Sequence, residues 1–228
     1  MPRAPRASVG DQCYHVLNRG NARRCVFHKD GDYAAFLKAM AHACIEVPMR
    51  VLGWTLMPNH FHLVLWPHHD GDLSQWMHWL QNTHVRRYHR HYKSDGHIWQ
   101  GRFKAFPIEH DEHLLTVLRY VERNALRAGL VQRAEQWPWS SLAAWIQLGE
   151  RPSYWHEGPV PRSEGWVQWV NEPATEAEIK ALRDTIQRGK PYGNPTWQQS
   201  MAVRLGLEAS MRPRGRPRKS AAAGENGQ

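Results

Sequence analysis

Two histidines stand two positions apart in the stretch TLMPNHFHLVLWPH, residues 55–68. The turn signal Pro58-Asn59 and the large apolar residues after it predict a short β-strand that begins near these histidines. Side chains at i and i+2 share one face of a strand, with Cα atoms roughly 6.5 to 7 Å apart, so His60 and His62 can reach a single metal ion. Hydrogen-bonded histidines at a sheet edge show the same spacing. The pair alone therefore does not define a metal site.

A tyrosine and an asparagine lie four positions apart in the segment DEHLLTVLRYVERNALRAG, residues 111–129. Its apolar spacing predicts a helix that ends at Gly129. Tyr120 and Asn124, at i and i+4, then lie along one flank of the buried stripe. The phenol oxygen is a nucleophile and the amide oxygen could complete a metal's coordination, whereas a tyrosine at such a flank more commonly serves packing. The buried stripe is expected to contain Leu114, Leu118, Val121 and Ala125.

The elements that must position these residues alternate along the first half of the chain. Alternating apolar residues predict strands at 12–20, 49–57, 61–67 and 101–110, the middle two joined as a hairpin. Helical spacing predicts helices at 30–47 and 72–93 in addition to 111–129. The order β-α-β-β-α-β is that of a ferredoxin-like α+β fold with an antiparallel sheet. The tyrosine-bearing helix follows the last strand, so it can cover the sheet face that the first two helices leave open.

Composition limits the setting and the partners of the protein. The 228 residues contain no apolar stretch near 18 residues and the N-terminus has no apolar leader, so we expect a soluble, cytoplasmic protein without a membrane partner. Cys13, Cys25 and Cys44 form no C-x-x-C pair and are expected to be reduced core residues. The net charge of +9 favours a polyanionic partner, although charge alone does not separate nucleic acid from an anionic membrane.

Four segments are expected along the chain. They are a core at 1–148, an irregular Trp- and Pro-rich segment at 149–174, a helical extension at 175–211 and a disordered basic tail at 212–228. In the extension, a capping box from Thr175 to Glu178 begins a helix that ends at Gly189, and a second helix is expected at 194–208. These helices could form a helix-turn-helix DNA reader or a packing appendage, and the sequence favours neither.

The basic tail opens with RPRGRPRK, residues 212–219, which carries five basic residues and no acidic one. Its Pro and Gly content excludes a helix. The stretch resembles the Gly-Arg-Pro core of an AT-hook, in which Arg214, Arg216 and Arg218 would contact DNA. A solvated tail without a fixed target is the alternative.

Several motifs together resemble one protein family. MPNHFHLVLWP resembles the HUH motif of the single-tyrosine transposases, and RYVERNALRAGLV resembles the tyrosine helix of their REP-associated branch. YHVLNRGNARR, GHIWQGRFKA and LGLEASMRPRGRPRK fall in the same order, so the likeness covers most of residues 12–132 and about 190–219. The chain departs from the branch at Ala125, where proline is frequent after the asparagine. That change alters local helix geometry and removes no reactive group.

The resemblance implies a metal-dependent single-strand DNA endonuclease and strand transferase. His60, His62 and Asn124 would bind Mg²⁺ or Mn²⁺, and Tyr120 would attack the scissile phosphate to give a 5′-phosphotyrosine and a free 3′-OH. The substrates would be repetitive extragenic palindromes (REPs), which form short DNA hairpins, and the protein would be a nucleoid-associated monomer or weak dimer. Phosphate contacts are expected from Arg19, Arg23, Arg24 and Arg102.

Two other functions fit parts of the sequence. A non-catalytic protein could grip DNA hairpins with its sheet and tail around a vestigial HUH site, although the intact His60, His62 and Tyr120 argue against it. A metal-dependent hydrolase could use water as its nucleophile, and Tyr120 would then be a bystander. A covalent protein–DNA adduct would distinguish the transferase from both.

Overall fold

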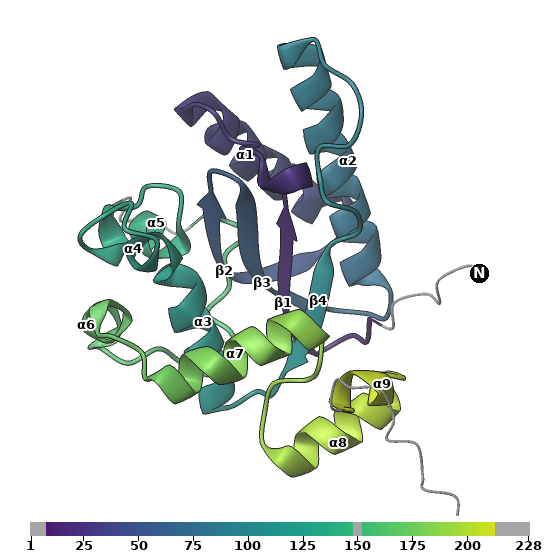
Figure 1. Cartoon of the computed structure of the whole chain (residues 1–228), viewed down its shortest axis with the longest axis vertical. Coiled ribbons are helices and arrows are strands. Elements are labelled where there is room, and N and C mark those ends of the chain that lie inside the picture. The colour runs from purple at the N-terminus through teal and green to yellow at the C-terminus, as the bar shows by residue number, and fades with distance from the viewer. Residues whose placement is uncertain (1–7, 148–151, 213–228) are drawn as a thin grey trace, which may run out of the picture.

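Four antiparallel strands lie at the centre of the protein, whose computed structural model describes residues 8–147 and 152–212 (Figure 1). The sheet has the strand order β2-β3-β1-β4. The strands are β1 (Cys13–Arg19), β2 (Met49–Met57), β3 (His60–Pro67) and β4 (Lys104–Ile108). Helix α1 (Asp30–Glu46) connects β1 to β2, and α2 (Asp72–Tyr92) connects β3 to β4. The predicted ferredoxin-like α+β arrangement is therefore confirmed.

Strand β4 is shorter than the predicted strand at 101–110. Gly101 has a φ of +115°, which interrupts an extended strand and which glycine adopts readily. The Gly101 carbonyl accepts a hydrogen bond from Asn18 Nδ2 (3.0 Å), and the Gln100 amide donates to the Arg19 carbonyl (2.8 Å). The chain therefore turns across the end of β1 before regular pairing starts at Lys104.

Helices cover both faces of the sheet. Helices α1 and α2 lie on one face, and α3 (Glu112–Glu122) lies on the other (Figure 1). Strand alternation divides the core accordingly, because Leu63 of β3 packs on the α1 and α2 side and Val64 packs on the α3 side. His60 and His62 alternate in step with Val64, so both point toward α3.

The predicted helix at 111–129 is divided in two. Helix α3 ends at Glu122, and a single turn of helix, α4 (Asn124–Arg127), follows after one residue. The break lies where Thr55 Oγ1 of β2 donates to the Val121 carbonyl (2.7 Å), a hydrogen bond that competes with the helix ladder. Tyr120 therefore lies in the last turn of α3, and Asn124 begins α4.

The predicted buried stripe holds α3 close to the sheet. All four residues are fully buried, namely Leu114, Leu118, Val121 and Ala125. Close approach requires the glycine at position 53 of β2, because a Cβ added there would lie 2.8 Å from Leu118 Cδ2. The distance between α3 and the sheet is thus set by Gly53, a strand position that has no side chain.

The chain beyond α4 forms a series of short helices. The segment at 149–174, expected to be irregular, contains a helix because Trp166 and Val170 bury their side chains in the α3-side core. The helix expected at 194–208 breaks near Gly206, whose φ is +63°. The elements are η2 (Ala134–Gln136), α5 (Ser141–Gln147), α6 (Trp166–Asn171), α7 (Glu176–Arg188), α8 (Pro195–Arg204) and α9 (Glu208–Met211).

Both predicted ends of α7 are confirmed. The Glu178 amide donates to Thr175 Oγ1 (3.2 Å), and Glu178 Oε2 accepts from the Thr175 amide (2.7 Å), which completes the capping box. Gly189 follows the helix in a left-handed conformation. Local capping chemistry was sufficient to locate this helix.

Cysteine burial only partly follows the prediction. Cys13 is buried and Cys44 is half-buried, but Cys25 is exposed, so the prediction that all three are core residues is wrong. Cys25 lies in the loop between β1 and α1, where the backbone packs on the β2–β3 turn and leaves this side chain outside. None of the helices in the described ranges is long and apolar enough to cross a membrane.

A buried histidine on the α1 and α2 side makes stability depend on pH. His84 is 2% exposed, both of its ring nitrogens lack a hydrogen-bond partner among the described residues, and burial lowers its pKa to about 4. Below pH 6.5 this histidine binds a proton in the unfolded chain, whereas in the folded chain it does not until about pH 4. The free energy of unfolding is therefore unaffected by His84 above pH 6.5 and decreases as the pH falls from 6.5 toward 4.

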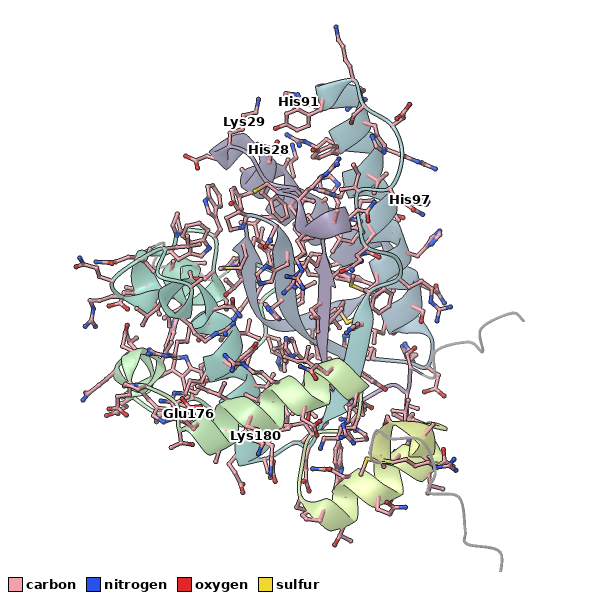
Figure 2. All side chains as sticks on the ribbon, in the orientation of Figure 1. His28, Lys29, His91, His97, Glu176 and Lys180 are labelled. Carbon is pink, nitrogen blue, oxygen red and sulfur yellow. The ribbon has the colours of Figure 1, made fainter. Side chains whose placement is uncertain are left out.

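We expect His84→Leu to reduce the acid sensitivity of folding. From the pKa values, His84 should lower the free energy of unfolding of the wild-type protein by about 2 kcal/mol between pH 8 and pH 5. His84→Leu should not show this decrease. Urea denaturation at both pH values measures it. His91→Leu, at an exposed position of the same helix labelled in Figure 2, is the control. Equal differences for wild type and His84→Leu would contradict the assignment.

Candidate active site

Two histidine rings meet on the α3 face of the sheet. His62 is almost completely buried and His60 is half-buried, with ring centroids 5.1 Å apart. They are the first and third residues of β3, directly after the tight Pro58-Asn59 turn. The hairpin therefore fixes where the strand starts and which face the two rings share.

A third histidine, which sequence reasoning did not single out, contacts this pair. His15 of β1 is fully buried, and its Nε2 lies 2.8 Å from His62 Nδ1. The signal was available in the strand YHVLNR, whose alternation sends His15 to the α3 face, but only the register of β1 against β3 shows that the two rings meet. The contact occupies Nδ1 of His62 and leaves Nε2 as the ring nitrogen that could face a metal ion.

The turn residue Asn59 sets the tautomer of His60. Asn59 Nδ2 donates to the Arg23 carbonyl (3.1 Å), so Asn59 Oδ1 faces His60 and accepts from His60 Nδ1 (2.6 Å). His60 Nδ1 therefore carries the proton, and Nε2 keeps its lone pair. An ordered hydrogen bond on one ring nitrogen is the usual way in which a protein presents the other nitrogen to a metal.

Both strand histidines are neutral near pH 7. Burial lowers the pKa of His60 to about 4; the charge of Arg19 lowers it further, while a hydrogen bond that the protonated ring would form with Asn124 opposes the shift. Burial also holds the pKa of His62 well below its usual range, and the nearby His15 adds to the effect. Neutral imidazole is the form that binds metal ions.

Asn124 completes a possible ligand set. It is almost fully buried at the start of α4, and it is within hydrogen-bonding reach of His60. Asn124 Nδ2 has no hydrogen-bond partner among the residues that the structure describes. Two imidazole nitrogens and one amide oxygen, with positions left open for substrate and water, suit Mg²⁺ or Mn²⁺. The residues present therefore fit a divalent ion.

Tyr120 stands over the histidines. Its half-buried ring has its centroid 5.8 Å from that of His62 and 6.1 Å from that of His15, edge to face in both cases. The Tyr120 hydroxyl forms no hydrogen bond to any described residue and is free to meet a substrate. Arg127 Cζ lies 5.2 Å from the Tyr120 ring centroid, a second neighbour that the sequence did not reveal.

The predicted phosphate-binding arginines of the core gather near one end of the sheet. Arg19 pairs with His60 across β1 and β3, so both side chains leave the same face. Arg23 and Arg24 are exposed in the loop that packs on the Pro58-Asn59 turn, and exposed Arg102 follows the turn at the end of β1. The tail residues Arg214, Arg216 and Arg218 lie outside the described residues.

An acidic group elsewhere has the spacing of metal ligands but a structural role. Glu109, Asp111 and His113 bring ligand atoms within 4.8 Å of one another. The group follows the far end of β4, away from the histidine pair. Asp111 Oδ1 caps α3 by accepting from the His113 amide (2.9 Å), and Glu109 accepts two hydrogen bonds from Asn194 (2.7 Å each). These carboxylates hold the fold together.

Comparisons with known proteins agree with the resemblance seen in the sequence. The sequence model of the family described as "Transposase IS200 like" matches residues 8–124, a range that includes all three residues of the possible ligand set and Tyr120. A Haemophilus influenzae protein assigned to the REP-associated tyrosine transposases is 25% identical over 141 residues, 57% of this chain and 80% of that protein. The REP-associated tyrosine transposase of Escherichia coli K12 is 25% identical over 120 residues, 51% of this chain and 70% of that protein.

A solved structure shares the fold. It is a REP-associated tyrosine transposase bound to a REP hairpin, and it superposes with a TM-score of 0.54 at 20% identity. The match covers 77% of this chain and 100% of the solved chain. At this identity the likeness establishes the architecture, and the chemistry must be argued from the side chains.

Proposed function

This chain belongs to the family of IS200-like transposases, and on that premise we propose that it cuts and rejoins single-stranded DNA through Tyr120. The observation that carries the proposal is the unbonded Tyr120 hydroxyl beside His60, His62 and Asn124. A nucleophile next to a ligand set with open positions is what phosphoryl transfer to a protein side chain requires.

The chemical step transfers a phosphoryl group from one oxygen to another. The Tyr120 oxygen loses its proton to solvent and forms a bond to the scissile phosphorus, while the bond from phosphorus to the 3′-oxygen breaks and that oxygen takes up a proton. The product is a 5′-phosphotyrosine and a free 3′-OH. Because the phosphodiester energy is conserved, attack by another 3′-OH reverses the step without ATP.

His60, His62 and Asn124 would hold Mg²⁺ or Mn²⁺, which when bound supplies a Lewis acid at the scissile phosphate. Two contacts within the chain orient the histidine rings. The hydrogen bond to Asn59 orients His60, and the contact with His15 orients His62. Burial of the His62 ring also limits the access of water to this part of the site.

Basic side chains around the site would bind the DNA backbone. Arg127 beside Tyr120 and Arg19 beside His60 are placed to neutralise phosphate near the reacting atoms. Arg23, Arg24 and Arg102 extend this surface along one end of the sheet, and the tail would add Arg214, Arg216 and Arg218. A hairpin of the REP type is the proposed substrate, because the named relatives are REP-associated and the net charge of +9 suits a polyanion.

A covalent adduct is the test of this proposal. We expect the purified protein, incubated with Mg²⁺ and a 5′-extended hairpin oligonucleotide, to form a denaturation-resistant species whose DNA is attached to the Tyr120 peptide in mass spectrometry. A water-using hydrolase would give cut DNA without adduct, and a non-catalytic binder would give neither. Either result would overturn the proposal. An oligonucleotide of equal composition without the palindrome separates hairpin recognition from cleavage.

A further inference from the structure

A small cavity opens on the side of Tyr120 that faces the C-terminal extension. Its volume is about 250 Å³, and it lies between α3 and α4 on one side and residues 173–182 on the other. Figure 2 labels Glu176 and Lys180 on this first part of α7. One wall is cationic and aromatic and consists of Arg119, Tyr120, Arg123 and Arg127. The facing wall combines the apolar Pro173, Ala174, Ile179 and Leu182 with the carboxylates of Glu176 and Glu178, of which Glu178 is paired with Arg119 and bonded to Thr175.

The apolar wall is fastened directly to the tyrosine helix. Arg119 donates to the carbonyls of Trp169 (2.9 Å), Glu172 (2.8 Å) and Pro173 (3.2 Å). Arg123 donates to the two carbonyls that lie between them, those of Val170 (3.0 Å) and Asn171 (2.5 Å). Charge-assisted hydrogen bonds of this kind fix the spacing between α3 and residues 169–173, which lead into α7. The cavity is therefore a built feature of the fold.

These hydrogen bonds occupy Arg119 and Arg123 but leave Arg127 available. Arg127 is exposed, lies against the Tyr120 ring, and has no ion-pair partner within the described residues. The cavity thus offers apolar side chains, the Tyr120 ring and the cation of Arg127, unpaired among the described residues, beside the carboxylates of Glu176 and Glu178. This combination suits a nucleotide, whose base packs on apolar and aromatic groups and whose phosphate pairs with arginine. The volume is below that of typical drug-sized pockets, so it suits one base.

We propose that this cavity binds the deoxynucleotide on the 3′ side of the scissile phosphate, the one that stays attached to Tyr120 after cleavage. The inference rests on the proposed function. In-line attack places the departing 3′-oxygen on the far side of phosphorus from the tyrosine oxygen, toward the histidines. The nucleotide that keeps the 5′-phosphate becomes bonded to the Tyr120 oxygen, and Tyr120 lines the cavity. Residues 173–182, beyond the family match at 8–124, would select its base.

Cleavage of a substrate series tests base selection. Hairpin oligonucleotides carry each of the four bases, or an abasic sugar, just 3′ of the cut. We expect the kcat/KM of the wild-type protein to differ by about tenfold or more among these bases. Ala174→Trp, which fills the cavity, should cleave every substrate at the rate that wild type shows with the abasic substrate. The matched control is Ala177→Trp, at an exposed position of α7 outside the cavity. Unchanged base ranking in Ala174→Trp would overturn the inference.

Two more conservative variants test the same cavity in case Ala174→Trp does not fold. Ile179→Ala widens the cavity and should weaken discrimination at the same nucleotide, whereas Lys180→Ala, which lies outside the cavity, should preserve it. If Ile179→Ala retained the wild-type preference, the cavity would not be the base site.

Binding without cleavage separates the cavity from the chemistry. A 5′-phosphorylated oligonucleotide with 2-aminopurine as its first base is titrated into Tyr120→Phe, with and without Ala174→Trp, and fluorescence reports stacking. We expect Ala174→Trp to weaken binding by about tenfold, the loss of one stacked base. Such an effect, together with failure of the wild-type protein to form an adduct, would support the cavity and refute the proposed chemistry. Adduct formation with no effect of Ala174→Trp would refute the cavity alone.

Discussion

Tyr120→Phe is expected to abolish DNA cleavage while leaving the fold and hairpin binding close to wild type. The change removes one oxygen that forms no hydrogen bond to a described residue, so little stability depends on it. It also removes the proposed nucleophile. Loss of a nucleophile in a covalent enzyme costs roughly 10⁶-fold in kcat, so cleavage should fall by at least about 10⁴-fold in a single-turnover assay.

The matched control is Tyr192→Phe. Tyr192 is buried on the same side of the sheet, beside His113 at the far end, so the same atom is removed away from the site. This control should cleave like wild type. Cleavage by Tyr120→Phe at more than a small fraction of the wild-type rate would show that another group attacks the phosphate.

His62→Ala is expected to lower cleavage in Mg²⁺ by about 10³-fold, because a metal ion at a phosphate contributes several kcal/mol and each 1.36 kcal/mol is tenfold in rate. Metal affinity should fall as well, measurable by the Mn²⁺ signal in electron paramagnetic resonance. EDTA should stop cleavage by the wild-type protein, and Mg²⁺ or Mn²⁺ should restore it.

His15→Leu, which removes the ring that contacts His62, should lower cleavage by a smaller factor, about 10- to 100-fold.

A buried histidine on the opposite face is the control for the metal experiment. His84→Ala removes a ring of equal burial that packs among Phe27, Phe36 and Trp99 on the α1 and α2 side. It should lower stability and leave Mn²⁺ affinity unchanged. Wild-type Mn²⁺ affinity in His62→Ala, or an equal loss of affinity in His84→Ala, would refute metal ligation by His62.

The arrangement of the sheet was accessible from sequence because strand and helix periods are local properties. Alternation predicted that His60 and His62 share one face of the sheet, and helical spacing predicted that Tyr120 and Asn124 lie on a segment that could cover the face left open by the first two helices. Pattern and order together therefore predicted which elements meet. The roles of these residues in metal binding and catalysis stay predictions.

Contacts that depend on register or on distant segments were not accessible. The His15 contact requires the exact register of β1 against β3, and this register cannot be predicted from the sequence of either strand alone. The break before Asn124 lies beside a hydrogen bond from Thr55, a residue of β2. Helix α6 was missed because its six residues are stabilised by burial of Trp166 and Val170 against α3, and so short a helix has little local signal.

The hydrogen bonds from Arg119 and Arg123 to residues 169–173 have a consequence for how the protein is made. A ribosome completes the histidine strand, Tyr120 and Asn124 before it reaches the wall that these arginines hold. At usual synthesis rates, the 58 residues from Asn124 to Leu182 take roughly 3 to 12 s. During that interval a nascent chain carries Tyr120, the proposed nucleophile, without the cavity beside it. The proposed selection of the base next to the cut would thus arise later in synthesis than the groups proposed to cut.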